Sequence, residues 1–354
     1  MEDIFFSLLR SALWGAGEEL PASLTSSELS KIMQMAEEQT VVGLAVDAII
    51  QKNINIGKSA PIKLFALSQQ IKTANIFLNK EIAEFVKLMD SNNVEYYIVK
   101  GQTVAALYRE PYTRMPGDID FYVKDYKGTA ETLSREWHIT LPEKLIDKEA
   151  SFTHNNSLYE IHKTFVEFGS KGHQKYWDEL TKTPPYPIDI DGVKVNTFEP
   201  TLYAVYVFIH LFFHFIREGV GLRQLCDWAM MLQVWKDEID KNKLQEILHE
   251  LGIEKAYCAF GYILLDKLGL EYFPLAISVK EIEASQKILK DIMRVGNFGK
   301  YGRKGKKGKW SYKFETMRLT FRNVFKYYSL APKEIGLMIP KLVKMNLKLI
   351  ASRN

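Results

Sequence analysis

Residues 100–123 have the sequence KGQTVAALYREPYTRMPGDIDFYV, and this stretch decides the fold class of the chain. A glycine follows the apolar run 96–99, and the pair Asp118 and Asp120 opens a second apolar run. Short apolar runs bounded by turn residues are typical of buried strands. The order therefore predicts a phosphate-binding turn next to a strand that carries two carboxylates.

The spacing of Asp118 and Asp120 gives the pair a chemical meaning. Alternate residues of a strand share a face, so the two Cα atoms should lie about 6.6 Å apart with both side chains on one side. Carboxylates at that spacing repel each other, and a divalent cation between them relieves the repulsion. Oxygen ligands favour Mg²⁺ or Mn²⁺ over Zn²⁺. An Asp-x-Asp pair also occurs by chance in strands and turns, so a further ligand is needed to support a metal site.

A third carboxylate follows on a predicted hairpin. Residues 150–165 contain two runs of strand-forming residues on either side of Asn155-Asn156, a polar pair that favours a tight turn. On the second strand, Glu160 and His162 share one face. If this strand pairs with the Asp-x-Asp strand, Glu160 completes a three-carboxylate cluster. Otherwise Glu160 and His162 are exposed or half-exposed residues of an edge strand.

With these motifs in place, the chain resembles the uncharacterised nucleotidyltransferases of the polymerase-beta-like superfamily. Members carry Lys-Gly after the first core strand, Arg-x-x-Gly-Asp-x-Asp at the second and Glu-x-His on a later strand. The corresponding residues here are Lys100-Gly101, the stretch from Arg114 to Asp120, and Glu160-Ile161-His162. The resemblance continues through segments 210–214 and 221–227 towards the basic C-terminal third, and so covers most of the chain.

The resemblance implies an α+β fold, in which a polymerase-beta-like nucleotidyltransferase core has a small mixed sheet and flanking helices. N-terminal helices and a C-terminal helical domain complete it. We expect transfer of an NMP group from an NTP such as ATP to an acceptor hydroxyl, with release of pyrophosphate and two Mg²⁺ or Mn²⁺ ions. The expected catalytic residues and metal ligands are Asp118, Asp120 and Glu160. The expected nucleotide-binding residues are Lys100, Gly101, Gln102, Arg114, His162, Arg223 and Asp227.

Gln102 departs from the superfamily pattern, which has Gly-Gly or Gly-Ser where this chain has Gly101-Gln102. A small second residue lets backbone N–H groups approach a phosphate closely. Gln102 therefore leaves the placement of the triphosphate open. Arg114 also has two interpretations, since it either contacts phosphate or pairs with the carboxylates. Glu160 in turn either binds the second ion or accepts the proton of the acceptor hydroxyl.

Length and composition predict a cytoplasmic globular enzyme. The chain has 354 residues, 47% of them hydrophobic, which suits two domains or one elaborated domain. Cys226 and Cys258 lie far apart and lack the spacing of a metal site, as expected in a reducing compartment. The N-terminus lacks a basic region, so residues 4–13 favour a buried or amphipathic helix over a signal peptide.

We expect three segments: an N-terminal helical segment 1–90, a nucleotidyltransferase catalytic core 91–199 and a C-terminal helical domain 200–354. Residues 71–89 have the spacing of a long helix that leads into the core. Residues 127–137 predict a helix within the core, and residues 188–195 predict a short hairpin or an edge strand. The second Asp-x-Asp pair, Asp189 and Asp191, precedes a glycine and is more typical of a hairpin tip than of a metal site.

The apolar run 202–216 is shorter than the ~20 residues that span a bilayer, so it predicts a buried helix and no transmembrane segment. His210 and His214 lie one turn apart within it. They offer a metal-binding pair, but the Glu of the metalloprotease motif is missing, which favours core packing. Arg223 and Asp227 are also one turn apart, and either form an ion pair or line the nucleotide cleft.

Charge is unevenly distributed along the chain. Residues 296–354 contain fifteen Lys or Arg against two Glu and carry a formal +13, so the remainder carries −9 of the total of +4. The basic, glycine-rich loop 299–309 is a solvated loop, a polyanion-binding patch or a lid over the triphosphate. Residues 317–328 and 335–350 predict amphipathic helices.

The basic third keeps a second hypothesis open, a catalytically silent nucleotide- or nucleic-acid-binding module. The acidic remainder of the chain favours a small-molecule or protein acceptor over nucleic acid, which stays possible. The presence of all three carboxylates favours the enzyme, because a silent module would be free to lose them. The sequence predicts no oligomeric state.

Overall fold

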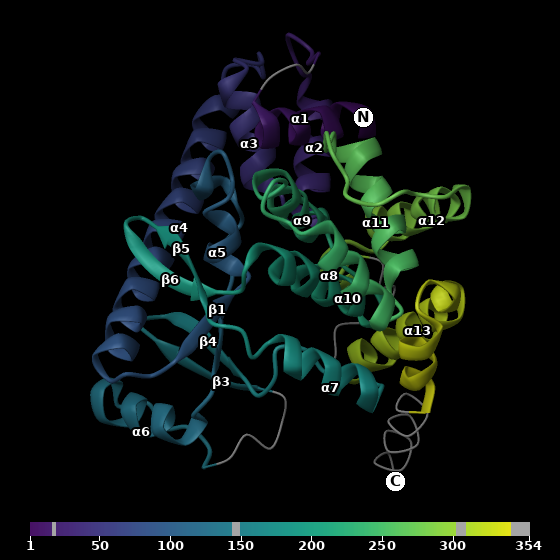
Figure 1. The fold of residues 1–354 in the computed structure, drawn as a ribbon. Coiled ribbons are helices and arrows are strands. Elements are labelled where there is room, and N and C mark those ends of the chain that lie inside the picture. Colours follow the sequence, from purple (N-terminus) through teal and green to yellow (C-terminus); the bar gives the residue numbers. More distant parts are fainter. Residues whose placement is uncertain (16–18, 144–148, 302–308, 341–354) are drawn as a thin grey trace. The chain divides into compact units, whose positions relative to one another are not determined.

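The computed structural model describes residues 1–15, 19–143, 149–301 and 309–340 (Figure 1). These residues form two compact units. Unit 1 comprises Met1–Ala36, Val41–Phe165 and Thr183–Tyr203, and unit 2 comprises Glu37–Thr40, Val166–Lys182 and Ala204–Asn354. Unit 1 thus joins the N-terminal helices to the sheet. The three-segment division expected from sequence stays a prediction.

Unit 1 begins with four helices: α1 (Glu2–Trp14), α2 (Ser26–Glu38), α3 (Val42–Gln51) and α4 (Ala60–Ser91). The last of these is 32 residues long and extends the helix expected over residues 71–89 towards the N-terminus. A proline in its first turn suits this start, because proline lacks the N–H that would have no partner there. Ile71, Leu78, Ile82 and Phe85 of α4 are buried at helical spacing and form its inner face.

A four-stranded mixed sheet is the centre of unit 1. Its strands are β1 (Tyr96–Val99), β2 (Ile119–Val123), β3 (Glu149–His154) and β4 (Ser157–His162), in the order β1-β2-β4-β3. Strands β2 and β4 are parallel, and the other two pairs are antiparallel. Phe85 of α4 packs against Phe121 and Tyr159, with ring centroids 4.7 and 6.0 Å apart, so α4 covers one face of the sheet. The α+β fold expected from the resemblance is confirmed.

The β3–β4 hairpin turns at Asn155 and Asn156, whose φ angles are 46° and 68°. Two consecutive residues with positive φ form the type of turn that matches the twist of the flanking strands, and asparagine tolerates that conformation. A second hairpin, β5 (Tyr186–Ile190) and β6 (Val193–Thr197), turns in the same way at Asp191 and Gly192. Both hairpins agree with the turns expected from sequence. The connecting elements of unit 1 are α5 (Gly101–Ala105), η1 (Pro111–Thr113) and α6 (Tyr126–Trp137).

Unit 2 is helical. Its helices are α7 (Lys171–Leu180), most of α8 (Pro200–Arg217), α9 (Leu222–Val234), α10 (Lys241–Glu250), α11 (Glu254–Leu268), α12 (Val279–Val295) and α13 (Lys309–Tyr327), with 3₁₀ turns η2 (Asn297–Gly299) and η3 (Tyr328–Leu330). By length and composition α8 could cross a membrane, but 83% of it is buried inside the structure. It is therefore the buried helix expected over residues 202–216. Phe208 of α8 packs against Trp228 and Tyr257, with ring centroids 4.9 and 4.8 Å apart.

The helix at residues 332–340 is anchored in unit 2 by Glu334. This carboxylate is buried and accepts backbone hydrogen bonds from Gly169 and Ser170, which precede α7, at 2.7 and 3.1 Å. It also pairs with Nδ1 of His173 at 2.6 Å. Most of the basic loop 299–309, and the end of the helix expected over 335–350, lie outside the described residues.

Candidate functional site

The parallel pairing of β2 with β4 gathers acidic side chains on one face of the sheet. Asp120 is opposite Glu160 in the register, so both side chains project from the same face. Asp118 lies immediately before β2, two residues from Asp120, and its charge acts on Glu160. Phe121 points to the other face, against α4. The strand adjacency on which the three-carboxylate hypothesis depended is therefore present.

Glu160 senses the surplus negative charge of this face. Burial raises the pKa of its carboxyl to about 7, and the charges of Asp118, Asp120 and Glu149 act in the same direction. His162 opposes them. At neutral pH Glu160 is thus divided between its protonated and ionised forms.

Asp120 is in the opposite situation, since it is buried but has two cationic or proton-donating partners. Its Oδ1 atom lies 3.0 Å from Nζ of Lys100 and 2.6 Å from Nε2 of His162. Burial alone would raise the pKa of Asp120, but the charge of Lys100 and then the hydrogen bond from His162 hold it well below its ordinary value. Asp120 is therefore ionised, and Nε2 of His162 donates to it. The other ring nitrogen of His162 lies 3.5 Å from a carboxylate oxygen of Glu149.

Lys100 and Gly101 form a tight turn between β1 and α5. Their φ angles are 62° and 49°, in the left-handed region, where glycine is favoured and a lysine is uncommon. The turn is held by Tyr203, whose hydroxyl accepts a hydrogen bond from the backbone N–H of Lys100 at 2.6 Å and contacts Oγ1 of Thr103 at 2.5 Å. Burial raises the pKa of Tyr203 to about 12, so this hydroxyl keeps its proton. The turn thus fixes the start of the Lys100 side chain that reaches Asp120.

The remaining residues expected near the nucleotide in unit 1 have structural partners. Gln102 is buried, and its Nε2 donates to Oδ1 of Asn79 on α4 at 2.5 Å. Arg114 is buried as well; its Nη1 donates to the carbonyl of Met115 at 3.3 Å, and its charge acts on Tyr203. The nucleotide-binding roles of Gln102 and Arg114 stay predictions.

Arg223 and Asp227 lie one turn apart on α9 in unit 2, where Asp227 is buried. The backbone N–H of Arg223 donates to the carbonyl of Gln39 at 3.3 Å, within the same unit. His210 and His214 of α8 stack with ring centroids 4.3 Å apart. The nucleotide contacts expected of Arg223 and Asp227 stay predictions.

Two residues of the site were not expected from sequence. Glu149 faces His162 in the β3–β4 register, and the tight Asn155-Asn156 turn contained the information needed to find it. Tyr203 lies in a long apolar run, and no local pattern distinguishes it from its buried neighbours.

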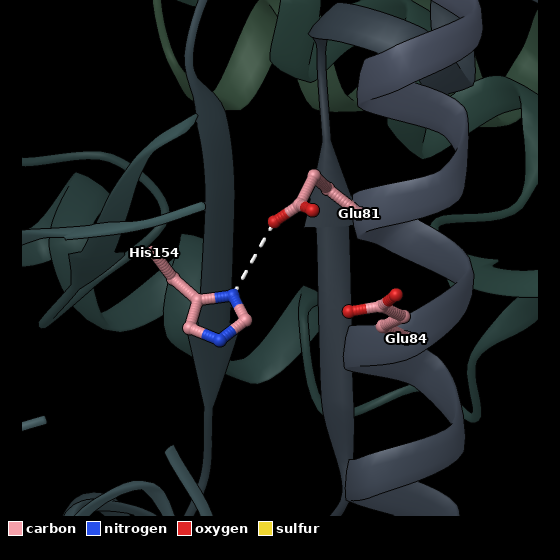
Figure 2. Close-up of side chains that lie close together, drawn as sticks. All are labelled: Glu81, Glu84 and His154. Atoms are coloured by element: carbon pink, nitrogen blue, oxygen red, sulfur yellow. Dashed lines mark hydrogen bonds and ion pairs between the residues drawn. The ribbon is translucent and has the colours of Figure 1, made fainter. Parts of the chain in front are cut away.

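A second cluster lies on the opposite face of the sheet, where α4 packs. Figure 2 shows the carboxylate of Glu81 turned towards the imidazole of His154, with Glu84 one turn further along α4. Glu81 is buried and accepts from Nδ1 of His154 at 3.3 Å, from the Asn155 amide at 3.1 Å and from the Tyr159 hydroxyl at 3.2 Å. Because these protein donors satisfy the carboxylate, the cluster is explained as the anchor of the β3–β4 turn to α4.

The first cluster fits a divalent cation. One ligand atom each from Asp120, Glu160 and His162 lies within 4.8 Å of the others, and Asp118 adds a carboxylate at the same face. The raised pKa of Glu160 shows that the negative charge there exceeds what Lys100 and His162 compensate. A divalent cation would remove that excess, and carboxylate oxygens are suitable ligands for it.

A mixed sheet with carboxylates on two neighbouring strands and a Lys-Gly turn after the first strand defines a nucleotidyltransferase-like site. The chain belongs to a family described as uncharacterised nucleotidyltransferases, whose model matches residues 25–265. The resemblance inferred from the motifs is confirmed, and the family and fold support nucleotidyl transfer. Members of this family typically use divalent metals.

Among solved structures, the chain is similar to a crystal structure of an antigenic nucleotidyltransferase-like protein from Paracoccidioides brasiliensis. The TM-score is 0.33 and the identity 17%, over 57% of this chain and 94% of that one. No curated protein matches the chain.

Proposed function

We propose that the protein is a Mg²⁺-dependent nucleotidyltransferase that moves an NMP group from an NTP to an acceptor hydroxyl and releases pyrophosphate. One observation carries the proposal: Asp118, Asp120 and Glu160 converge on one face of the sheet, beside Lys100, in a chain of this family. The acceptor in this proposal is a small molecule or a protein. Positioning and charge neutralisation provide most of the catalysis in such transfers, so few reactive side chains are needed.

Asp118 and Asp120 would hold Mg²⁺, with Glu160 as a further ligand of a second ion. When bound, the ions would neutralise the triphosphate and lower the pKa of the acceptor hydroxyl. His162 is a positioning residue in this scheme, because its Nε2–H fixes the orientation of the Asp120 carboxylate.

Lys100 provides the positive charge for phosphate. Its ammonium pairs with Asp120 at 3.0 Å, and we propose that it pairs with a β- or γ-phosphate oxygen when the NTP binds. The tight backbone turn at Gly101 supports this role, since it places the base of Lys100 at the end of β1. Arg114 is a second candidate for the same charge.

Glu160 can also act as the base that receives the acceptor's proton. A pKa of about 7 suits that task, because a base is most effective when its pKa is close to the working pH. Its two roles, ligand and base, are compatible with one position on β4.

Thermal melts with each NTP, with and without Mg²⁺, test the binding step. We expect at least one NTP to raise the melting temperature only when Mg²⁺ is present, because a ligand that binds the folded state alone stabilises it. The Asp118→Asn variant should lose this shift and also lose transfer of label from an α-radiolabelled NTP to acceptors in a cell extract. Asp118 is a suitable target because its side chain makes no hydrogen bond or ion pair within the described part of the chain.

Asp90→Asn is the matched control, since Asp90 is an exposed residue of α4 away from the cluster. No shift with any NTP at millimolar concentration, or an equal shift in Asp118→Asn, would overturn the proposal. Magnesium-dependent binding without any labelled product would favour the catalytically silent module.

A further inference from the structure

A polar pocket lies in unit 1, formed by residues outside the acidic cluster. Its volume is about 340 Å³, part of it open to solvent, at the lower end of the range of small-molecule sites. The polar residues of its wall are Asn79 of α4, Gln102 of α5, Tyr112 of η1, and Asp189 and Asp191 of the β5–β6 hairpin. The rest of the wall is made of Ala105, Ala106, Pro111 and Ile190.

A chain of hydrogen bonds in this wall has a fixed direction. The carboxylate of Asp191 can only accept, so the group that contacts its Oδ2 at 2.7 Å must be the Nδ2 amide of Asn79. The other end of that amide, Oδ1, is then an acceptor and receives Nε2 of Gln102 at 2.5 Å. The ionised Asp191 thus determines the orientation of both amides.

This direction leaves one acceptor without a donor. Gln102 is 4% exposed, and its Oε1 atom is buried and receives no hydrogen bond in the described structure. A buried carbonyl oxygen in this state is costly, and such groups usually mark the place of a bound donor. The pocket that Gln102 lines is the space from which a donor can reach it.

The charge of the wall is negative. Asp189 is balanced by Lys194 at 3.2 Å and by the backbone N–H of Gly192 at 2.8 Å. Asp191 accepts hydrogen bonds from Asn79 and, at 2.9 Å, from the hydroxyl of Tyr112, but it has no lysine or arginine partner among the described residues. One carboxylate of the pocket therefore lacks a counter-charge.

We propose that this pocket is a binding site for a small organic cation, a compound with a protonated amine next to a second hydrogen-bond donor. One donor of the ligand meets Oε1 of Gln102, and its positive charge balances Asp191. An anion is disfavoured by the two carboxylates, and an apolar compound would leave Gln102 unsatisfied. The site requires neither NTP nor Mg²⁺, so it goes beyond the proposed function and can be tested apart from it.

Ethanolammonium is a suitable probe, because it carries one ammonium and one hydroxyl on two carbons. Ethylene glycol has the same shape and two donors but no charge, and it serves as the matched control ligand. Both are titrated into the full chain without nucleotide or metal, and the ¹H–¹⁵N signals of the side-chain amides are followed. The NH₂ pair that disappears in Gln102→Met identifies Gln102. We expect ethanolammonium to shift this pair saturably and ethylene glycol to shift it at least tenfold more weakly.

The Asp191→Asn variant keeps an amide oxygen as acceptor for its neighbours and removes the charge. Its side chain is exposed at a hairpin tip, so the fold should survive, and we expect affinity for ethanolammonium to fall at least tenfold. Asp90→Asn removes an exposed charge of the same unit that does not line the pocket, and should leave affinity unchanged. The absence of a saturable shift, equal binding of the two probes, or unchanged affinity in Asp191→Asn would overturn the proposal and leave water as the occupant.

Discussion

Replacement of Glu160 by glutamine should stabilise the metal-free protein at about pH 8 and leave it nearly unchanged at about pH 5. The ordinary pKa of a glutamate is 4.5, and burial with the charges of Asp118, Asp120 and Glu149 raises that of Glu160 to about 7. The folded state therefore holds a proton that the unfolded state has lost between these two values. Stability falls as pH rises through this range, because the folded state binds more protons there.

The size of the effect follows from the shift. About 2.5 units at about 1.36 kcal/mol each sets a ceiling near 3 kcal/mol. Glu160 is only half-buried, and solvent screens its repulsion, so we expect about 1–2 kcal/mol. Glutamine removes the negative charge and with it this cost, whereas at pH 5 the native glutamate is itself mostly protonated. Each kcal/mol corresponds to a change of about 2–4 °C in melting temperature for a protein part of this size.

Thermal melts of both proteins in a metal chelator, at the two pH values, measure the difference. Glu19→Gln, an exposed glutamate of unit 1, is the control and should change the melting temperature equally little at both. Added Mg²⁺ should stabilise the native protein more than Glu160→Gln at pH 8. An equal shift at both pH values, or a lower melting temperature of Glu160→Gln at pH 8, would refute the electrostatic reasoning.

Three further substitutions should destabilise the protein, each measured by denaturant unfolding. Asp120→Asn should cost about 1–3 kcal/mol at neutral pH, because it leaves Lys100 without its anion. The pKa of Asp120 is depressed in the folded state, so this contribution is present above its ordinary value of 3.8 and the difference should shrink in acid. Glu81→Ala should cost about 1–3 kcal/mol, because the donors at the β3–β4 turn lose their acceptor. Glu334→Ala should cost a similar amount, about 1–3 kcal/mol, because two backbone N–H groups before α7 lose theirs.

Each of these has a result that contradicts it. An Asp120→Asn protein as stable as the native one at neutral pH would mean that its contact with Lys100 contributes nothing. Unchanged unfolding of Glu81→Ala would leave its cluster open to another explanation. For Glu334→Ala, an unchanged midpoint would show that the helix at residues 332–340 is held by its apolar contacts alone.

The sequence contained much of the acidic cluster because that part of the site depends on local rules. Strand alternation places Asp118 and Asp120 on one face, and the Asn155-Asn156 turn sets the register of the hairpin that carries Glu160. The parallel pairing of β2 with β4 was needed to bring these pieces together. It is a long-range contact, and the pattern of residues could only state it as a condition.

Other parts of the site depend on packing between distant segments, which no local pattern encodes. The hydroxyl of Tyr203 reaches Lys100 across 103 residues, and the link from Asn79 to Asp191 spans 112. Gln102 illustrates the difference: the sequence showed that it departs from the superfamily pattern. Only the tertiary structure shows that its side chain is bonded to α4.

The order of strands has a consequence for how the chain acquires its acidic face during folding. Val99 pairs with Asp120 in the antiparallel β1–β2 ladder, so this shorter-range contact can bring Lys100 beside its anion early. The β3–β4 hairpin closes over two residues and can form independently. Joining the two halves through β2 and β4 adds Glu160 to a carboxylate whose charge is already partly neutralised. Loss of Lys100 would therefore be felt as slower refolding as well as lower stability.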